Sequence, residues 1–253
     1  MNDVNNIQTF SSGSDQYAKH RPQYPAELFS YLNEICERHE RAWDCATGNG
    51  QSAIGCAKYF SQVDATDLSA EQIQHGIAHP KIKYSVSPAE HTPFADQSMD
   101  LVTVATAVHW FDQKNFFREV DRVLKPKGVL AIWGYSFFEI EPAVDELINK
   151  VLLEPIQPFW TEGNRQVMSG YPNLSLPFDE ISNSPTFAIK VEWTLQQFLA
   201  YVCTWSAVKR YITEVGTDPV SELESQLRTI WSETDQTKPI HMPLVFKASR
   251  KPA

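Results

Sequence analysis

The stretch AWDCATGNG, residues 42–50, decides the fold. It joins a predicted strand, Arg41–Cys45, to a turn that contains Gly48 and Gly50, and a helix predicted over Gln51–Phe60 follows. Glycine permits positive φ and lets a ligand lie against the backbone, while the start of the helix offers free N–H groups. The same glycines also suit a tight strand-to-helix turn without a ligand, so the loop alone leaves both interpretations open.

A second acidic residue points to the kind of ligand. Asp44 lies at the end of the first strand, and Asp67 ends the next predicted strand, Gln62–Thr66. A parallel sheet brings both strand ends to one edge, where a carboxylate can accept hydrogen bonds from the paired hydroxyls of a ribose. Asp67 could instead be a charge at the start of a helix, which Ser69 would cap and which would run to about Ala78. Together, the loop and Asp67 predict an adenosine-type ligand at the carboxyl edge of the sheet.

Apolar runs and helical patterns alternate along the first half of the chain, which favours a doubly wound α/β fold. The remaining predicted elements are a helix over Ala26–His39, strands over Ile82–Val86, Met99–Ala105 and Val129–Tyr135, a helix over Lys114–Leu124, and a turn over Lys125–Gly128. Residues 26–138 therefore form the predicted α/β core, with helices on both faces of a mostly parallel sheet.

The regular alternation stops after Phe138 and gives way to a Pro-rich, aromatic stretch. We predict that residues 139–235 form a cap or substrate region and that residues 236–253 complete the core. The elements expected there are a strand over Phe187–Trp193, helices over Leu195–Tyr211 and Pro219–Trp231, and a closing strand over His241–Lys247.

Composition excludes several classes of protein. The chain of 253 residues has a formal net charge of -9, from 22 Lys and Arg and 31 Asp and Glu, which disfavours nucleic acid and anionic membranes as partners. The four cysteines show no CxxC spacing, and the polar N-terminus resembles no signal peptide. We therefore predict a cytoplasmic protein with reduced thiols and no metal site, whose oligomeric state the sequence does not indicate.

A nicotinamide cofactor is the serious competitor at the glycine loop. The segment GNGQSA, residues 48–53, formally matches a dinucleotide-binding fingerprint with an acid about twenty positions further on. Asp44 argues against it, because dinucleotide sites usually have an apolar residue at that strand end.

Further segments identify a family. SPAEHTPFADQSMDLV (87–102), AVHWFD (107–112) and FFREVDRVLKPKGVLAIW (116–133) closely resemble consecutive motifs of class I S-adenosylmethionine-dependent methyltransferases. The likeness spans residues 40–135. It implies a seven-stranded, Rossmann-like sheet with an antiparallel final strand, and S-adenosyl-L-methionine as the cofactor.

The resemblance also implies roles for single residues. Asp44, Gly48 and Gly50 would line the methionine side of the cofactor, Asp67 would bind the ribose, and Leu68 would lie against the adenine. The remaining expected cofactor contacts are Ala46, Ala89, Glu90 and Ala105. Two positions depart from the family pattern: Pro88 stands where aspartate is more usual at the adenine edge, and Ala46 replaces the first glycine of the loop.

The acceptor end is expected just past the fourth strand, at His109-Trp110-Phe111-Asp112. His109 could deprotonate an acceptor or bind its anionic form, or it could simply cap the loop. We predict His109 and Trp110 as the catalytic residues. Few are needed, because methyl transfer is an in-line displacement that depends on alignment and exclusion of water.

The N-terminal stretch FSSGSDQYAKHRPQYP (10–25), together with HWFD, resembles the branch that includes trans-aconitate and cantharidin-acid methyltransferases. That branch methylates small carboxylic acids. The resemblance implies that residues 1–25 form a lid in which Tyr17, Arg21 and Tyr24 contact the substrate; the alternative is an arm that merely packs on the domain. The predicted activity is O-methylation of a small acidic acceptor. The alternatives are base-assisted N- or O-methylation of another metabolite, a nicotinamide oxidoreductase and a cofactor-binding protein without catalysis.

Overall fold

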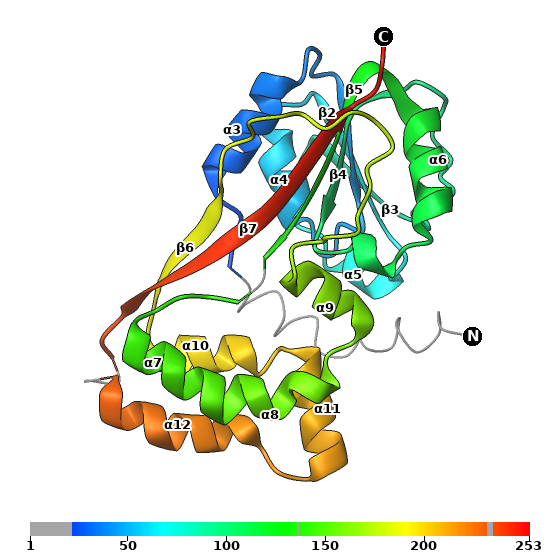
Figure 1. Ribbon diagram of the computed structural model, residues 1–253. Helices are drawn as coiled ribbons and strands as arrows, with labels where there is room; N and C mark the ends of the chain where they lie inside the picture. The colour runs from blue at the N-terminus through cyan, green and yellow to red at the C-terminus, as the bar shows by residue number, and fades with distance from the viewer. Residues whose placement is uncertain (1–21, 136, 232–234) are drawn as a thin grey trace.

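The fold centres on one mixed sheet, which is drawn in Figure 1. The computed structural model describes residues 22–135, 137–231 and 235–253. Within these ranges, seven strands pair in the order β3-β2-β1-β4-β5-β7-β6. They are β1 (Arg41–Cys45), β2 (Gln62–Asp67), β3 (Ile82–Val86), β4 (Met99–Ala105), β5 (Leu124–Tyr135), β6 (Ala188–Trp193) and β7 (Lys238–Arg250). Strands β1 to β5 are parallel, and β7 runs antiparallel to both β5 and β6, so the predicted mostly parallel sheet with an antiparallel final strand is confirmed.

Two hydrophobic layers cover the faces of the sheet, because successive residues of a strand point to opposite sides. On β5, Ala131 and Trp133 belong to the layer that includes helices α3 (Ala26–Ile35) and α4 (Gln51–Ala57). Leu130 and Ile132, the alternate residues, belong to the layer that includes α6 (Gln113–Val123). Both layers are buried, which explains the continuous apolar runs of the central strands and confirms the doubly wound arrangement.

A second group of helices occupies the chain between β5 and β7. The elements are α7 (Pro142–Ile148), the π-helical turn η2 (Asn149–Leu153), α8 (Glu154–Ile156), the 3-10 turn η3 (Gln157–Phe159), α9 (Glu162–Met168), α10 (Leu195–Val202), α11 (Ser206–Val215) and α12 (Pro219–Ile230). Figure 1 shows α7, α8, α10, α11 and α12 gathered beyond the end of the sheet at which β5 finishes, with α9 nearer the sheet. In the described part of the chain, no helix is long and apolar enough to cross a membrane.

The predicted helix over Leu195–Tyr211 is wrong, because α10 ends at Val202 and α11 begins only at Ser206. Between them, Thr204 donates both its N–H and its hydroxyl to the carbonyl of Tyr201, which replaces the helical pattern by a turn. Trp205 is extended, with φ of -70° and ψ of 134°. The break places its ring 5.6 Å from that of Trp160, in the core of the helical group.

The turn predicted over Lys125–Gly128 lies inside a strand. Helix α6 ends at Val123 and β5 begins at Leu124, while the β4–β5 register shifts between Met99 and Leu101. Lys127 has a φ of 66°, so turn chemistry is present but forms an irregularity of the ladder instead of a free loop. Other predicted bounds also move: α3, α4 and α5 (Ala70–Gln74) end before His39, Phe60 and Ala78, and β7 is longer than predicted.

Candidate active site

The loop after β1 follows a left-handed backbone at three positions. Ala46, Gly48 and Gly50 have φ angles of 53°, 56° and 94°. A Cβ at Gly50 would lie 2.0 Å from the hydroxyl oxygen of Tyr84 on β3, so packing requires glycine there. Among the residues that the structure describes, a Cβ at Gly48 would have only the Gln72 side chain near it, at 3.8 Å. The backbone at Gly48 is therefore open to a ligand, whereas the packing of Tyr84 excludes a side chain at Gly50.

Asp44 lies beneath this loop, and its side chain is almost completely buried. One carboxylate oxygen accepts the hydroxyl of Thr47 at 2.5 Å, and the other accepts the hydroxyl of Thr103, on β4, at 2.7 Å. Burial raises the pKa of Asp44, and the hydroxyls of Thr47 and Thr103 oppose that rise by stabilising the charged form. Asp44 thus joins the loop to β4.

Asp67 lies beside the same loop, as the parallel pairing of β1 and β2 predicts. One carboxylate oxygen accepts the N–H of Gly48 and the other accepts the N–H of Ser69, both at 2.9 Å. Ser69 in turn caps α5 by accepting the N–H of Gln72 at 3.3 Å. Burial raises the pKa of Asp67, and the backbone N–H bonds oppose it. The loop contact and the helix-start contact therefore exist together, and each oxygen keeps capacity for a further hydrogen bond.

An apolar surface follows Asp67 at the carboxyl edge. Leu68 and Val86, at the ends of β2 and β3, are 51% and 54% exposed. Ala89 is buried in the loop after β3. Glu90 accepts the backbone N–H of Asp112 at 3.0 Å, so its carboxylate connects this loop to the segment between β4 and α6. Exposed large apolar side chains beside an open backbone suit the flat face of a base.

The end of β4 carries the predicted acceptor residues. Ala105 is the last residue of β4, and Thr106 after it has a φ of 55°. His109 and Trp110 follow in the 3-10 turn η1 (Val108–Trp110), and their rings are 4.8 Å apart. Asp112 accepts the N–H of Asn115 and caps α6, so the acidic residue of HWFD has a structural role.

His109 is held from two sides. Its Nδ1 lies 2.9 Å from the hydroxyl of Tyr171, and a Cβ at Gly163, on α9, would lie 2.8 Å from its Cδ2. Burial lowers the pKa of His109 from its ordinary 6.5 to about 4, so the imidazole is neutral at pH 7. The structure therefore argues against a charged histidine that would neutralise an anion.

The predicted lid residues are only partly within the described ranges. Tyr17 and Arg21 lie outside them. Tyr24 lies at the carboxyl edge, with its hydroxyl 3.3 Å from Oγ1 of Thr106 and its ring edge-on to Trp133 at 5.6 Å. Tyr24 therefore contacts the end of β4, next to the predicted acceptor residues.

Sequence reasoning missed four residues that shape this site. Thr47 and Thr103 hold Asp44, Tyr84 excludes a side chain at Gly50, and Tyr171 bonds His109. The threonines carry no signal beyond their types, and Tyr171 is sixty-two positions from its partner. Only Gly170, a stop signal before Tyr171, could have indicated a turn there.

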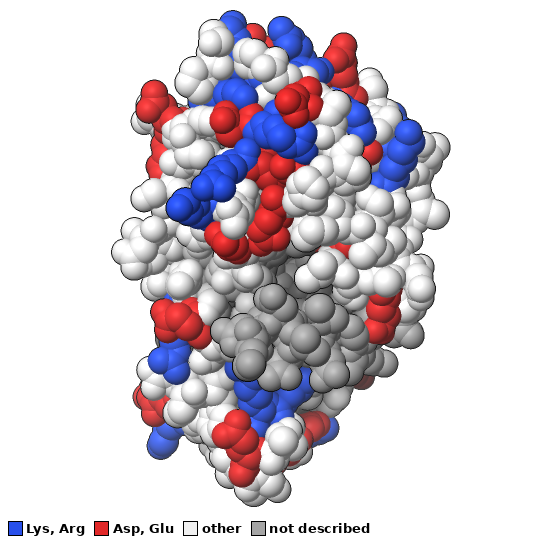
Figure 2. Space-filling model, turned by 90° about the vertical axis from the view of Figure 1, so that its right-hand side faces the viewer, with Lys and Arg blue, Asp and Glu red and all other residues white. Residues whose placement is uncertain are grey.

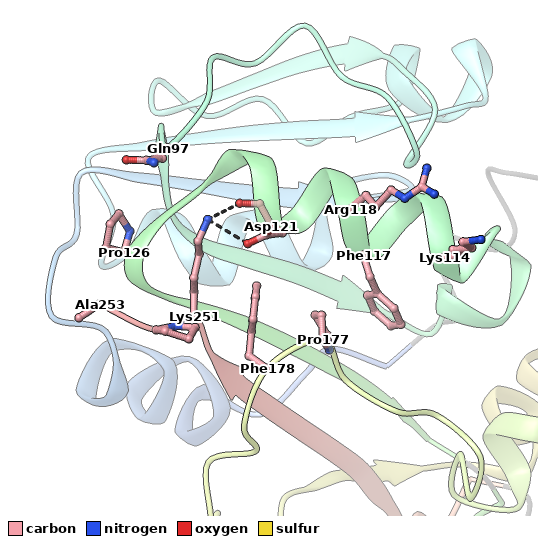
Figure 3. A pocket seen from close by; sticks show the side chains of 11 residues that line it. Gln97, Lys114, Phe117, Arg118, Asp121, Pro126, Pro177, Phe178, Lys251 and Ala253 are labelled. Carbon is pink, nitrogen blue, oxygen red and sulfur yellow. Dashed lines mark hydrogen bonds and ion pairs between the residues drawn. The ribbon is translucent and has the colours of Figure 1, made fainter.

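A hollow of about 740 Å³ lies elsewhere on the α/β domain, between α6 and the last residues of the chain (Figure 3). Figure 3 shows Phe117, Pro177 and Phe178 around it, and Lys251 bonded to Asp121 at its rim. None of the predicted site residues that the structure describes lines it. On the face drawn in Figure 2, Lys and Arg side chains are interspersed with Asp and Glu. Among the residues described, no three His, Cys, Asp or Glu side chains gather as metal ligands.

The open backbone at Gly48, the carboxylate of Asp67 and the apolar edge are features that a nucleoside-type ligand would require at the carboxyl edge of this doubly wound sheet. Residues 43–132 match the family model of a methyltransferase domain. A solved structure assigned as a type II methyltransferase of Anaeromyxobacter dehalogenans is 34% identical, with a TM-score of 0.87, and the match covers 92% of this chain and 99% of that one.

Two further comparisons agree. A protein of Dictyostelium discoideum, assigned as a methyltransferase, is 29% identical over 230 residues, which are 89% of this chain and 87% of that protein. Phosphoethanolamine N-methyltransferase 2 of Haemonchus contortus, solved with phosphomonomethylethanolamine and S-adenosylhomocysteine, shares the fold at 16% identity and a TM-score of 0.50, covering 99% of this chain and 59% of that one. The chain belongs to the class I S-adenosylmethionine-dependent methyltransferases. It is an enzyme, its cofactor is S-adenosyl-L-methionine, and the nicotinamide interpretation is wrong.

The described residues fit this cofactor. Gly48 presents open backbone, Asp67 retains hydrogen-bonding capacity next to it, and Leu68 with Val86 offers an exposed apolar edge. Pro88 provides no carboxylate at the adenine edge, and the nearby Glu90 is already bonded to Asp112.

Proposed function

We propose that the enzyme methylates a carboxylate oxygen of a small organic acid and that the product is a methyl ester. The observation that carries this proposal is the state of His109. A histidine whose pKa is lowered to about 4 is a weak base at neutral pH, and Tyr171 already bonds its Nδ1. An acceptor that must lose a proton, such as a phenol or a protonated amine, would find little help from it. A carboxylic acid is already ionised and needs none.

The cofactor contacts follow from the same edge of the sheet. Asp67 would accept the ribose hydroxyls, and Leu68 and Ala89 would lie against the adenine. Gly48 would approach the methionine portion, while Asp44, which is buried, would act through its hold on Thr47. Ala46, Gly50, Glu90 and Ala105 would shape the walls of this site and connect them to the acceptor end.

When bound, S-adenosyl-L-methionine supplies a methyl group on a sulfonium, and the acceptor oxygen bonds to that carbon as the carbon–sulfur bond breaks. The protein therefore has to align the acceptor and exclude water. His109 and Trp110 stand where β4 ends, beside the open loop of β1, because these two strands are neighbours. A neutral imidazole N–H there can donate a hydrogen bond to the acceptor carboxylate.

An acidic acceptor also requires a local positive charge, since the chain has a formal net charge of -9. We assign this part to Arg21, with Tyr17 and Tyr24, in an N-terminal lid of residues 1–25. The neighbouring contact of Tyr24 with Thr106 supports it. Residues 139–235 would supply the remaining walls of the acceptor pocket, because their helices lie beyond the carboxyl end of β5 (Figure 1).

The test is an acceptor screen with the purified enzyme and S-adenosyl-L-methionine, using small mono-, di- and tricarboxylic acids beside amines and phenols. We expect methyl esters from one or more acids. Arg21→Ala should raise the acceptor KM much more than it changes cofactor affinity, and His109→Ala should leave measurable turnover. Methylation of amines or phenols only, abolished by His109→Ala and rising with pH through a histidine-like pKa, would identify a base-assisted N- or O-methyltransferase instead.

A further inference from the structure

Tyr171 occupies a backbone conformation that a bulky residue seldom adopts. Helix α9 closes with the N–H of Gly170 bonded to the carbonyl of Val167 and the N–H of Tyr171 bonded to the carbonyl of Gln166. This pattern needs one left-handed residue, and Gly170, with φ of 83°, supplies it. Tyr171 is left-handed as well, with φ of 52°. Backbone strain of this kind, in a residue with a large side chain, persists where the surrounding contacts hold it, and it concentrates at functional sites.

The buried hydroxyl of Tyr171 contacts His109. Tyr171 is 2% exposed, and its hydroxyl lies 2.9 Å from Nδ1 of His109. Across the described ranges, this hydroxyl has no other hydrogen-bond partner. A buried hydroxyl hydrogen without an acceptor is costly, so Tyr171 donates and Nδ1 of His109 accepts. Burial also raises the pKa of Tyr171, which keeps the proton on its oxygen.

Because Nδ1 of His109 accepts a hydrogen bond, the protonation of the other ring nitrogen, Nε2, is fixed. In a neutral imidazole one nitrogen accepts and the other bears the hydrogen, so Nε2 carries the proton. The Cδ2 edge packs against the backbone at Gly163, and the Trp110 ring lies 4.8 Å away, so the ring has little freedom to turn over. Within the part of the chain that the structure describes, Nε2 forms no hydrogen bond, which leaves its N–H for a ligand.

We propose that Tyr171 is a positioning residue, which holds His109 in the tautomer protonated at Nε2 so that His109 serves the acceptor as a hydrogen-bond donor. The inference rests on the proposed function for the nature of the acceptor, a carboxylate. It gives the strained tyrosine at position 171 a role, since a phenylalanine would fill the same space but could not determine which nitrogen of His109 carries the hydrogen. The donor then acts in the substrate complex and removes no proton from the acceptor.

The tautomer can be measured without any acceptor. We would label the histidine imidazoles of the full-length enzyme with ¹⁵N, record one-bond and two-bond ¹H–¹⁵N spectra at pH 7, and assign the His109 signals with His109→Gln. The wild type should show an unprotonated Nδ1 and a protonated Nε2. Tyr171→Phe should shift His109 toward a mixture of tautomers. Tyr31→Phe is the matched control, because it removes a tyrosine hydroxyl bonded to Ser184 at 3.1 Å, on another element.

Kinetics give the second measurement. With an acid that the wild type methylates, Tyr171→Phe should raise the acceptor KM about three- to tenfold, the scale of one hydrogen bond, and leave the affinity for S-adenosyl-L-methionine unchanged. Wild-type His109 protonated at Nδ1, or a Tyr171→Phe enzyme with unchanged tautomer and KM, would overturn the inference. If no acid is turned over, the proposed function fails by itself, and the wild-type spectrum still decides the tautomer.

Discussion

Replacing Gly50 with alanine should destabilise the protein by about 2 to 3 kcal/mol, and the structure divides this cost into two parts. The first is conformational, because an alanine in the left-handed region costs about 1 to 2 kcal/mol, and Gly50 has a φ of 94°. The second is steric. The new Cβ would lie 2.0 Å from the hydroxyl oxygen of Tyr84 and 3.0 Å from its Cζ, so the ring must move away. That movement breaks the hydrogen bond from Tyr84 to the carbonyl of Ile77, worth about 1 kcal/mol.

Urea unfolding can separate the two parts. Gly216→Ala is the matched control, since Gly216 has a φ of 81° and a Cβ there would meet none of the described residues within 4 Å. Gly216→Ala should therefore cost the conformational part alone. Gly50→Ala should cost about 1 kcal/mol more, and this excess should disappear when Tyr84→Ala is introduced as well. Equal costs for Gly50→Ala and Gly216→Ala would refute the reasoning, because Tyr84 would then impose nothing on the loop.

The other expectations concern the same site. Ala46→Gly should raise stability by about 0.5 to 1 kcal/mol, since Ala46 has a φ of 53°, and an unchanged or lower melting temperature would contradict this. Asp67→Ala should weaken binding of S-adenosyl-L-methionine by about 1 to 3 kcal/mol in calorimetry. Asp218→Ala, which removes a similar helix-start bond to the N–H of Val220 at 2.9 Å, should not affect binding, and equal affinities for the two variants would leave Asp67 a purely structural role. His109 has a pKa of about 4 in the folded state against 6.5 when unfolded, so its contribution to stability is complete above pH 6.5 and is lost as the pH falls toward 4. The loss should amount to about 2 to 3 kcal/mol and should be missing in His109→Gln, measured by urea unfolding across that pH range; identical pH profiles would show that His109 is not desolvated.

The fold could be predicted where local pattern and burial agree. Strands β1, β2, β3 and β4 lie within one residue of their predicted bounds, because apolar runs or a period of two marked them. The prediction failed where tertiary packing overrides local chemistry. A Lys-Pro-Lys-Gly sequence signals a turn, but its residues remain within β5, and the break before Trp205 depends on Thr204 and on an aromatic core that only the folded chain assembles.

The placement of the candidate site residues was predictable in outline for a similar reason. Parallel pairing of β1 with β2 and β4 brings strand ends to one edge, so Asp67 and His109 could be placed from their positions alone. The burial of Asp44 and the bond from Tyr171 to His109 could not be predicted, because they depend on side chains that meet from distant segments. The periodicity of apolar residues carries no information about such long-range side-chain contacts.

The position of β7 has a consequence for how the chain acquires its structure during synthesis. Val129 of β5 pairs with Arg250 of β7, so the outer neighbour of β5 in the sheet is made more than a hundred residues after β5 itself. Until then one edge of β5 has no partner, and β6 has no sheet to join, since within the described ranges β6 pairs with β7 alone. A nascent chain therefore exposes an apolar strand edge through the whole translation of the intervening helices, and such edges recruit other strands. Pairing of β7 and β6 with the rest of the sheet must wait until residues 238–250 have been made, so this side of the sheet depends on delayed, long-range closure.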